Sequence, residues 1–222
     1  MPYKAIIFDL DGTLLDTVED ITDAVNRVLS RNGFPIHTLD AYRDFVGHGT
    51  TMLITRALPQ ERRDNDTISS CVRMLREDYA LNWNVKTKRY DGIDKMLDAI
   101  TARGLRMAIL SNKFHKITTL SVETFLPHWT FDIVQGQCDT IPLKPDPTGA
   151  LEIAGQLDVL PSDCLFVGDT AIDMKTAVAA GMFPVGALWG FRPKELKKSS
   201  AKRLISSPPE LLDLIDLPQE NS

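Results

Sequence analysis

Short runs of consecutive apolar residues alternate along most of the chain with stretches of helical periodicity. Five of the apolar runs predict strands, at Ala5–Phe8, Arg106–Leu110, Phe131–Val134, Cys164–Val167 and Pro184–Leu188. Between the later runs, apolar residues recur at helical spacing over residues 93–102, 116–125, 148–157 and 173–180. Strands that alternate with helices in this way indicate βαβ units. We therefore expect an α/β fold built around a parallel sheet.

The interval from about residue 15 to about residue 85 has no strand pattern and interrupts this alternation. Its periodicity predicts four helices, over residues 18–30, 38–45, 51–57 and 67–82. We expect an all-helical insert, joined to the sheet by linkers near residues 14–17 and 83–90. The chain would then have a core domain of residues 1–14 and 86–222 and a helical cap domain of residues 15–85. After residue 193 we expect a short basic helix, a loop and a last helix at Pro209–Ile215.

Composition restricts the class of protein. The 222 residues are 43% hydrophobic and 25% charged, which is typical of a globular chain with a sizeable core. No apolar run approaches the roughly 20 residues that span a bilayer. The net charge of −5 and the lack of a long basic block argue against nucleic-acid and membrane partners. The cysteines Cys71, Cys138 and Cys164 form no metal or disulfide motif, and no secretory signal is recognised, so we expect a cytoplasmic protein.

Two acidic residues end the first apolar run, where Asp9 and Asp11 precede Gly12. In open α/β sheets, ligands bind just beyond the carboxyl ends of the strands. Two neighbouring carboxylates repel each other, so their burial requires a metal ion, a shared proton or an electrophile. Gly12 would permit a sharp turn and a close approach by a ligand. The alternative interpretation is an ordinary surface turn, for which Asp-Gly is also common.

Polar residues follow other predicted strands in the same manner. They are Ser111-Asn112-Lys113, the segment Lys144-Pro145-Asp146-Pro147, and the pair Asp169 and Asp173. Alternatively, Ser111 would cap the following helix and Lys144 would be solvated. Carboxylates without cysteine or histidine favour a hard cation, most simply Mg²⁺. A hydroxyl, lysines and a metal that face one point suit a phosphoryl group, whose charge spreads over three oxygens during transfer.

These motifs, in this order, resemble those of phosphatases of the haloacid dehalogenase superfamily. The similarity covers nearly the whole chain and is carried by Asp9-Leu10-Asp11-Gly12-Thr13, Ser111-Asn112, Lys144-Pro145-Asp146-Pro147, and Gly168-Asp169 with Asp173. The resemblance implies a Rossmann-like core with an inserted small helical cap. It also implies hydrolysis of a small phosphomonoester, and therefore a small phosphorylated metabolite as the partner of a monomer or homodimer.

The resemblance further implies a role for each motif residue. Asp9 would be the nucleophile that forms an aspartyl-phosphate intermediate. Asp11 would protonate the leaving alkoxide and then activate the hydrolytic water. Phosphate would be bound by Ser111, Asn112 and Lys144. Mg²⁺ would be held by Asp9, the main-chain carbonyl of Asp11 and Asp169, with Asp173 either as a further ligand or as a residue that supports the ligands.

The predicted cap contains a segment that bears on the substrate, Phe45-Val46-Gly47-His48-Gly49-Thr50. This segment and residues 189–196 resemble phosphoglycolate phosphatases, so we expect 2-phosphoglycolate as the substrate. Gly47 and Gly49, on either side of His48, would let backbone amides approach a ligand, and Arg56 would reach a substrate carboxylate. The alternatives are a plain turn and a solvated arginine. Family members commonly carry asparagine or a similar small polar residue at the position of His48, which leaves a different substrate tail open.

Three other functions stay open from the sequence. The chain could be a pyrophosphatase or a broad sugar-phosphate or nucleotide phosphatase. It could be an isomerase of the phosphoglucomutase type, which uses the same two aspartates and returns the phosphoryl group to its sugar. It could also be a non-catalytic binding protein on the same fold, because fold does not determine function.

Overall fold

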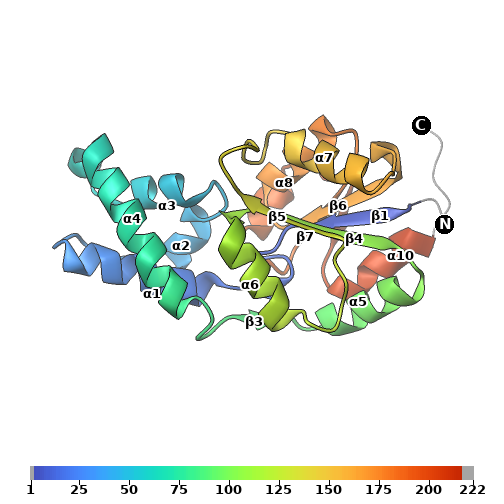
Figure 1. Cartoon of the computed structure of the whole chain (residues 1–222), viewed down its shortest axis with the longest axis horizontal. Helices are drawn as coiled ribbons and strands as arrows, with labels where there is room; N and C mark the ends of the chain where they lie inside the picture. The colour runs from blue at the N-terminus through green and yellow to red at the C-terminus, as the bar shows by residue number, and fades with distance from the viewer. Residues whose placement is uncertain (1–2, 217–222) are drawn as a thin grey trace.

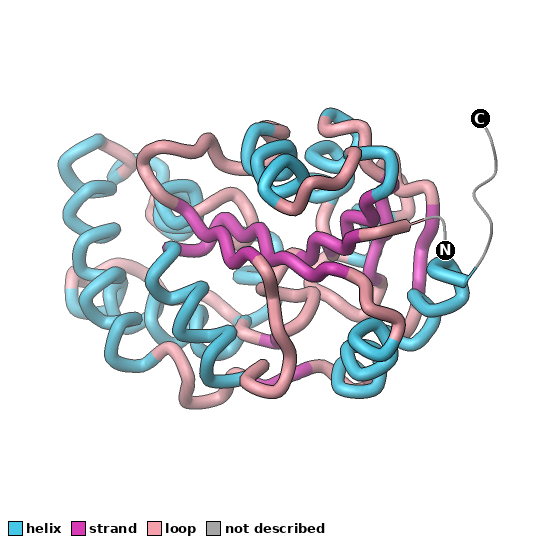
Figure 2. The backbone as a smooth tube through the Cα atoms, turned by 45° about the vertical axis from the view of Figure 1, so that its right-hand side comes forward, coloured by secondary structure: helices cyan, strands magenta, loops and turns pink. Residues whose placement is uncertain are grey.

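The computed structural model describes residues 3–216, and a six-stranded parallel sheet runs through one part of it (Figures 1 and 2). The strand order is β5-β4-β1-β6-β7-β8, so β1 lies between β4 and β6. The predicted α/β class is therefore confirmed. The strands are β1 (Ala5–Phe8), β4 (Arg106–Phe114), β5 (Ile133–Gln137), β6 (Cys164–Gly168), β7 (Phe183–Ala187) and β8 (Arg203–Ile205).

Helices cover both faces of the sheet. On one face, Ile6 and Phe8 of β1 pack in a cluster with α5 (Ile93–Ala102) and α10 (Leu211–Asp216). On the other face, Ala5 and Ile7 pack with α7 (Thr148–Gln156) and α8 (Ala171–Ala179). Figure 1 shows these helix pairs on opposite sides of the strands. Burial on both faces explains why β1 is apolar at every position rather than at alternate ones.

Four helices between β1 and β4 lie together at one end of the molecule, on the left in Figure 1. They are α1 (Val18–Arg31), α2 (Leu39–Phe45), α3 (Thr50–Ala57) and α4 (Asn65–Asn82), and we call residues 18–82 the helical insert. Their apolar side chains form a separate cluster, which Ile117 and Phe191 join from outside the insert. The four predicted helices are therefore present, each with bounds close to those expected from its periodicity.

The two connections to the helical insert are joined to each other. β2 (Leu15–Asp16) and β3 (Lys88–Arg89) form a short antiparallel ribbon. Next to it, the buried carboxylate of Asp20 accepts hydrogen bonds from the Lys86 N–H at 2.9 Å, the Thr87 N–H at 2.8 Å and the Thr87 hydroxyl at 2.7 Å. The sequence predicted linkers here without a ribbon, because strands of two residues carry no periodic pattern.

The tail differs from the sequence prediction by one strand. The chain forms α9 (Pro193–Leu196), then β8, a 3₁₀ turn (Pro208–Glu210) and α10. β8 pairs with β7 alone and lies at the edge of the sheet. A three-residue edge strand that starts with an arginine lacks the alternation that indicates a strand. Within residues 3–216, no helix is long and apolar enough to cross a bilayer.

We expect Asp20→Ala to lower the free energy of unfolding by about 1–3 kcal/mol, because it leaves buried N–H donors without a partner. Urea unfolding followed by circular dichroism measures this change. Asp23→Ala is the matched control on the same helix, since Asp23 is 41% exposed and meets Lys86 in a surface ion pair. Its loss should cost at most about 1 kcal/mol. Equal losses in both variants would contradict the role given to Asp20.

Candidate active site

The carboxyl ends of neighbouring strands bring together residues that are distant in sequence. Asp9 directly follows β1, and its main-chain N–H donates to the Val167 carbonyl of β6 at 2.9 Å. Asp169 directly follows β6. β4 lies on the other side of β1 and continues past the predicted Leu110 to Phe114. The predicted strand-end residues therefore meet at one edge of the sheet.

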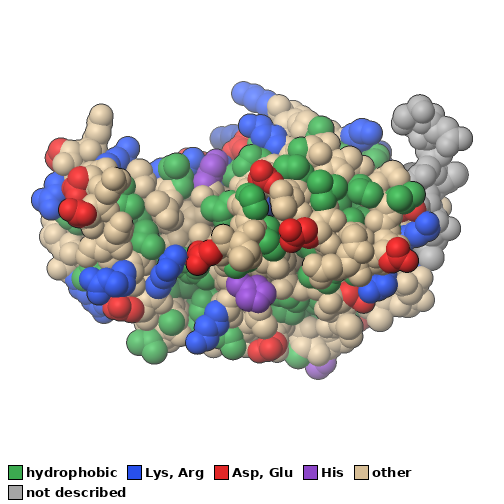
Figure 3. Space-filling model, turned by 45° about the horizontal axis from the view of Figure 1, so that its top comes forward, with side chains coloured by type: hydrophobic (Ala, Val, Ile, Leu, Met, Phe, Trp, Pro, Cys, Tyr) green, Lys and Arg blue, Asp and Glu red, His purple; other side chains and the backbone are tan. Residues whose placement is uncertain are grey.

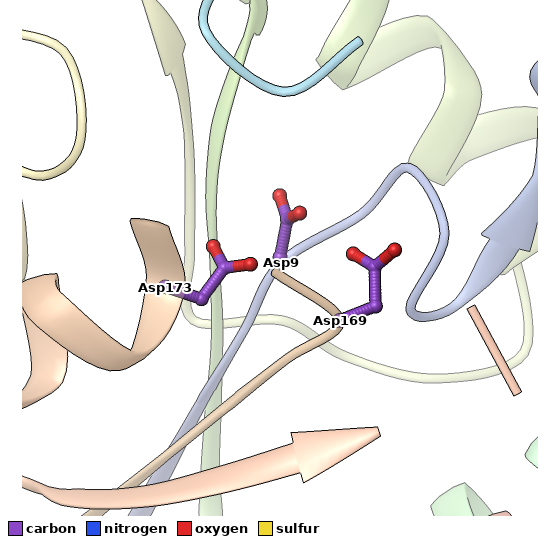
Figure 4. Close-up of side chains that lie close together, drawn as sticks. All are labelled: Asp9, Asp169 and Asp173. Carbon is purple, nitrogen blue, oxygen red and sulfur yellow. The ribbon is translucent and has the colours of Figure 1, made fainter. Parts of the chain in front are cut away.

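Three carboxylates form a buried cluster at this edge, made of Asp9, Asp169 and Asp173 (Figure 4). One oxygen of each lies within 4.8 Å of the others. Asp173 is in the first turn of α8, where the Thr170 N–H and hydroxyl donate to its Oδ2 at 3.0 and 2.6 Å. Asp169 Oδ2 accepts from the Phe191 N–H at 2.8 Å. Hydrogen bonds from neighbouring residues thus hold two of the three acids in place.

Two glycines leave the space that Asp169 occupies. A Cβ added at Gly12 would lie 2.3 Å from Asp169 Oδ2, and Gly12 also has a φ of +85°. A Cβ added at Gly190 would lie 2.3 Å from the Asp169 Cβ. Larger residues at either position would displace the carboxylate. Gly12 therefore makes the sharp turn expected from the sequence, but the group that approaches it closely is the Asp169 carboxylate, and Gly190 accommodates the same side chain.

Lys144 supplies the positive charge beside this cluster. Its buried Nζ lies 2.9 Å from Asp9 Oδ1 and 2.6 Å from Asp173 Oδ1. Burial raises the pKa of Asp9 to about 7, against the opposing effect of Lys144, and the nearby Asp173 adds to the rise. Burial likewise raises the pKa of Asp169 well above its ordinary value, and Asp173 and Asp9 add to it. Burial is therefore the main cause of both raised pKa values, and the Lys144 ammonium only partly opposes the rise at Asp9.

The cluster fits a hard divalent cation. Its donor atoms are carboxylate oxygens, the ligand type that Mg²⁺ prefers. The raised pKa values of Asp9 and Asp169 show that the site is short of positive charge. The side chain of Asp11 is not part of this group of three.

Asp11 is held by a different set of side chains. Lys113 Nζ donates to its Oδ1 at 2.9 Å and its Oδ2 at 3.2 Å, and the Thr17 hydroxyl donates to Oδ1 at 2.8 Å. Lys113 also donates to the Tyr79 hydroxyl of α4 at 2.9 Å, so the helical insert reaches the site. Thr17 and Tyr79 carry no sequence signal of this contact. Neither follows a strand that the apolar pattern predicts, since β2 before Thr17 has only two residues, and the aromatic ring of Tyr79 fits the ordinary apolar face of a helix.

Asn112 and Ser111 both lie within β4, upstream of α6 (His115–Phe125), so neither caps that helix. The Asn112 side chain accepts from the Lys144 N–H at 2.8 Å and donates to the Lys144 carbonyl at 3.0 Å. It also donates to the Gly47 carbonyl at 3.0 Å. Asn112 thus positions Lys144 and ties the insert to the sheet edge. Contact of either residue with phosphate stays a prediction.

A pocket opens over these groups, between the sheet edge and the helical insert. The volume of the cavity is about 90 Å³. Polar side chains line one part, among them Asp9, Asp11, Ser111 and Lys144. Apolar side chains line another, namely Ile21, Val46, Leu53, Leu75, Ile117 and Phe191. The dimensions and the convergent charges fit a compact, charged ligand.

The four predicted specificity residues fall into two groups. Gly47 and Gly49 line the pocket, and both have positive φ, of 105° and 81°. His48 and Arg56 are not among the lining residues. Arg56 Nη1 donates to the Asp44 and Phe45 carbonyls, each at 3.1 Å, and lies 3.1 Å from His48 Nδ1. The structure therefore gives Arg56 a role in joining α3 to the C-terminal end of α2, because its guanidinium is already engaged there.

Comparisons with known proteins agree with this geometry. Residues 6–187 match the family described as haloacid dehalogenase-like hydrolase. A phosphoglycolate phosphatase of Psychrobacter arcticus is 31% identical over 198 residues, which cover 86% of each chain. Another, from Aquifex aeolicus, is 30% identical over 213 residues, covering 96% of this chain and 97% of the relative. The crystal structure of a candidate phosphoglycolate phosphatase from Lactobacillus delbrueckii subsp. bulgaricus superposes with a TM-score of 0.90 at 28% identity, covering 97% of this chain and 99% of that one.

The fold, the strand-end acids and these relatives together define a hydrolase that acts on phosphoric monoesters. The chain belongs to the haloacid dehalogenase-like hydrolase family, and within it resembles the phosphoglycolate phosphatases.

We expect the metal-free protein to lose stability relative to an Asp9→Asn variant as the pH rises from about 4 to about 7. In this window the unfolded chain has released the Asp9 proton while the folded protein retains it, since the folded pKa is about 7. The folded state then binds more protons, so its stability falls by up to about 1.4 kcal/mol per pH unit for one proton. Urea unfolding in EDTA at several pH values tests this. The prediction is wrong if the unsubstituted protein instead gains stability relative to the Asp9→Asn variant as the pH rises.

Proposed function

We propose that the protein is a Mg²⁺-dependent phosphatase that hydrolyses 2-phosphoglycolate through an aspartyl-phosphate intermediate. The observation that carries the proposal is the separation of two neighbouring aspartates into different environments. Asp9 lies in the buried carboxylate cluster beside Lys144, whereas Asp11 is held outside it by Lys113 and Thr17. These two environments support Asp9 as the nucleophile and Asp11 as the proton carrier. The similarity to two phosphoglycolate phosphatases supports the choice of substrate.

Asp9 provides the nucleophile in this mechanism. Lys144 holds its Oδ1, which leaves Oδ2 to attack the phosphorus atom. The new bond from Asp9 to phosphorus forms as the bond to the ester oxygen breaks. Ser111 and Lys144 face the pocket, where they would bind and neutralise the phosphoryl oxygens.

Asp11 handles the protons in both steps. In the first step it would donate a proton to the leaving alkoxide, and in the second it would take a proton from the water that attacks the aspartyl phosphate. Hydrogen bonds from Lys113 and Thr17 hold the carboxylate of Asp11, which stands two residues after the nucleophile in the sequence. The second step returns Asp9 to its carboxylate form and releases phosphate.

Mg²⁺ would be held by Asp9, Asp169 and Asp173, together with the main-chain carbonyl of Asp11. When bound, it supplies positive charge that neutralises the phosphoryl oxygens. These acids are already positioned by hydrogen bonds from Thr170 and Phe191, so little rearrangement is needed to bind the ion.

In the same proposal, residues 15–85 form a cap domain over a core of residues 1–14 and 86–222. The separate apolar cluster of α1 to α4 and the two connecting strands support this division. A cap over the pocket would exclude water and large substrates.

On the face drawn in Figure 3, charges of both signs are interspersed rather than gathered in one basic patch. The cysteines Cys71, Cys138 and Cys164 are free thiols, as suits a reducing cytoplasm.

The first test is phosphate release from a panel of 2-phosphoglycolate, pyrophosphate, hexose phosphates and nucleoside monophosphates, with Mg²⁺ and then with EDTA. We expect release that depends on the metal and is fastest with 2-phosphoglycolate, because the pocket suits a compact anion. Selectivity for another member would overturn the substrate and keep the chemistry. Isomerised sugar phosphate with little free phosphate would instead indicate a mutase.

We expect Asp9→Asn to abolish turnover and Asp11→Asn to lower kcat by at least about a hundredfold, the usual contribution of general acid–base catalysis. Steady-state phosphate release at saturating Mg²⁺ measures both effects. Asp16→Asn is the matched control, since Asp16 lies near Asp11 in the chain but does not line the pocket. Normal turnover in either of the first two variants would refute the mechanism.

A further inference from the structure

We propose that Arg76 on α4 selects substrates that carry a carboxylate close to the ester oxygen. This inference rests on the proposed phosphatase function and assigns to one side chain the recognition of the second negative charge of the substrate. It replaces Arg56, which does not line the pocket and donates to carbonyls at the end of α2.

Arg76 is the one cationic side chain of the pocket wall without a carboxylate partner in the described part of the chain. Three such side chains line the pocket: Lys113, Lys144 and Arg76. Both lysines are buried and ion-paired with aspartates of the site. Across residues 3–216, Arg76 takes part in no salt bridge or hydrogen bond, and its contact is with an aromatic ring, that of Phe114. The pocket therefore has an unmatched positive charge on the side of the insert.

The contact with Phe114 orients the guanidinium for a ligand. The Arg76 Cζ lies 4.1 Å from the centroid of the Phe114 ring. An arginine stacked on a ring contacts it through the face of the guanidinium, so the N–H donors around its edge stay free. Those donors form a planar fork that matches the two oxygens of a carboxylate. Arg76 is thus held by an uncharged neighbour while its hydrogen-bonding capacity remains unused.

Two adjacent contacts place Arg76 on the leaving-group side of the site. Tyr79 lies one helical turn further along α4, and its ring and hydroxyl contact Lys113, with Nζ 4.8 Å from the ring centroid and 2.9 Å from the oxygen. Lys113 and Phe114 are consecutive in β4, so α4 meets the end of β4 through two crossed cation–π contacts. Lys113 also contacts Asp11, the acid proposed to protonate the leaving oxygen. Arg76 thus lines the pocket from the helix that contacts the Lys113–Asp11 pair through Tyr79, and in this proposal it faces the leaving-group side.

The chemistry of the substrate matches this placement. In 2-phosphoglycolate a single methylene carbon separates the ester oxygen from the carboxylate, so the carboxylate emerges on the leaving-group side. Leu75 and Ile117 line the same pocket with apolar surface. Arg76 is exposed to solvent in the free protein, but an ion pair that it forms with a carboxylate beside this apolar surface is weakened less by water than one on an open face. A substrate with an uncharged tail leaves Arg76 solvated and gains nothing from it.

The test compares 2-phosphoglycolate with ethyl phosphate, which lacks the carboxylate. We expect Arg76→Gln to lower kcat/KM for 2-phosphoglycolate about 10- to 100-fold more than for ethyl phosphate, the size expected for a charged hydrogen-bonded pair. Arg76→Lys should give an intermediate loss, because it keeps the charge and loses the fork. Arg73→Gln is the matched control on the same helix. Arg73 is 68% exposed, pairs with Glu77 and does not line the pocket, so both substrates should be unaffected.

A second readout does not depend on turnover. In the Asp9→Asn protein, calorimetry should show that Arg76→Gln weakens binding of 2-phosphoglycolate at least about tenfold and leaves inorganic phosphate binding unchanged. Equal losses for both ligands, or no loss, would overturn the inference even if the enzyme is a phosphatase. Arg76→Gln could weaken binding of 2-phosphoglycolate alone while the unsubstituted protein releases no phosphate from any ester. In that case the proposed function fails and the assignment of Arg76 stands.

Discussion

Three carboxylates buried within 4.8 Å of one another beside a single ammonium group repel each other, and much of the surrounding structure serves to hold them there. Thr170 and the backbone of Phe191 donate hydrogen bonds to Asp173 and Asp169. Asn112 fixes the segment that carries Lys144. Even so, burial keeps the pKa of Asp9 near 7. A site that is charged in this way favours ligands that bring positive charge, and this requirement links the fold to a metal-assisted reaction.

The parallel sheet makes this arrangement possible because it brings the carboxyl ends of distant strands to one edge. β1 and β6 supply the positions of Asp9 and Asp169, and β4 supplies Ser111 on the other side of β1. The helical insert contributes differently. It places no acid in the cluster, but its helix α4 contacts the end of β4 through Tyr79 and Arg76. In the proposed mechanism the sheet edge would thus provide the reacting groups, and the insert would contact the rest of the ligand.

The two groups of residues in the proposed mechanism belong to different parts of the fold. The groups proposed to act on the phosphoryl centre come mainly from strand ends whose positions are fixed by the hydrogen-bonded sheet. Arg76, proposed to act on the leaving-group side, comes from a helix that packs in a separate apolar cluster. Changes on α4 would alter recognition of the substrate tail without moving Asp9 or Lys144. Function is then decided by the site rather than by the fold.

The sequence alone determined the α/β class, the helical insert, the strand-end positions of Asp9 and Asp169 and the place of Asp173 one helical turn later, because apolar periodicity and strand-end position are local properties. It did not indicate β8 or the ribbon of β2 and β3, which are too short to carry a period. Only the tertiary structure decided that the Asp11 side chain stands apart from the carboxylate cluster, and that Arg76 rather than Arg56 faces the pocket. Those outcomes depend on how α4 packs against β4. The two segments are distant in sequence, and neither has a local pattern that predicts the contact.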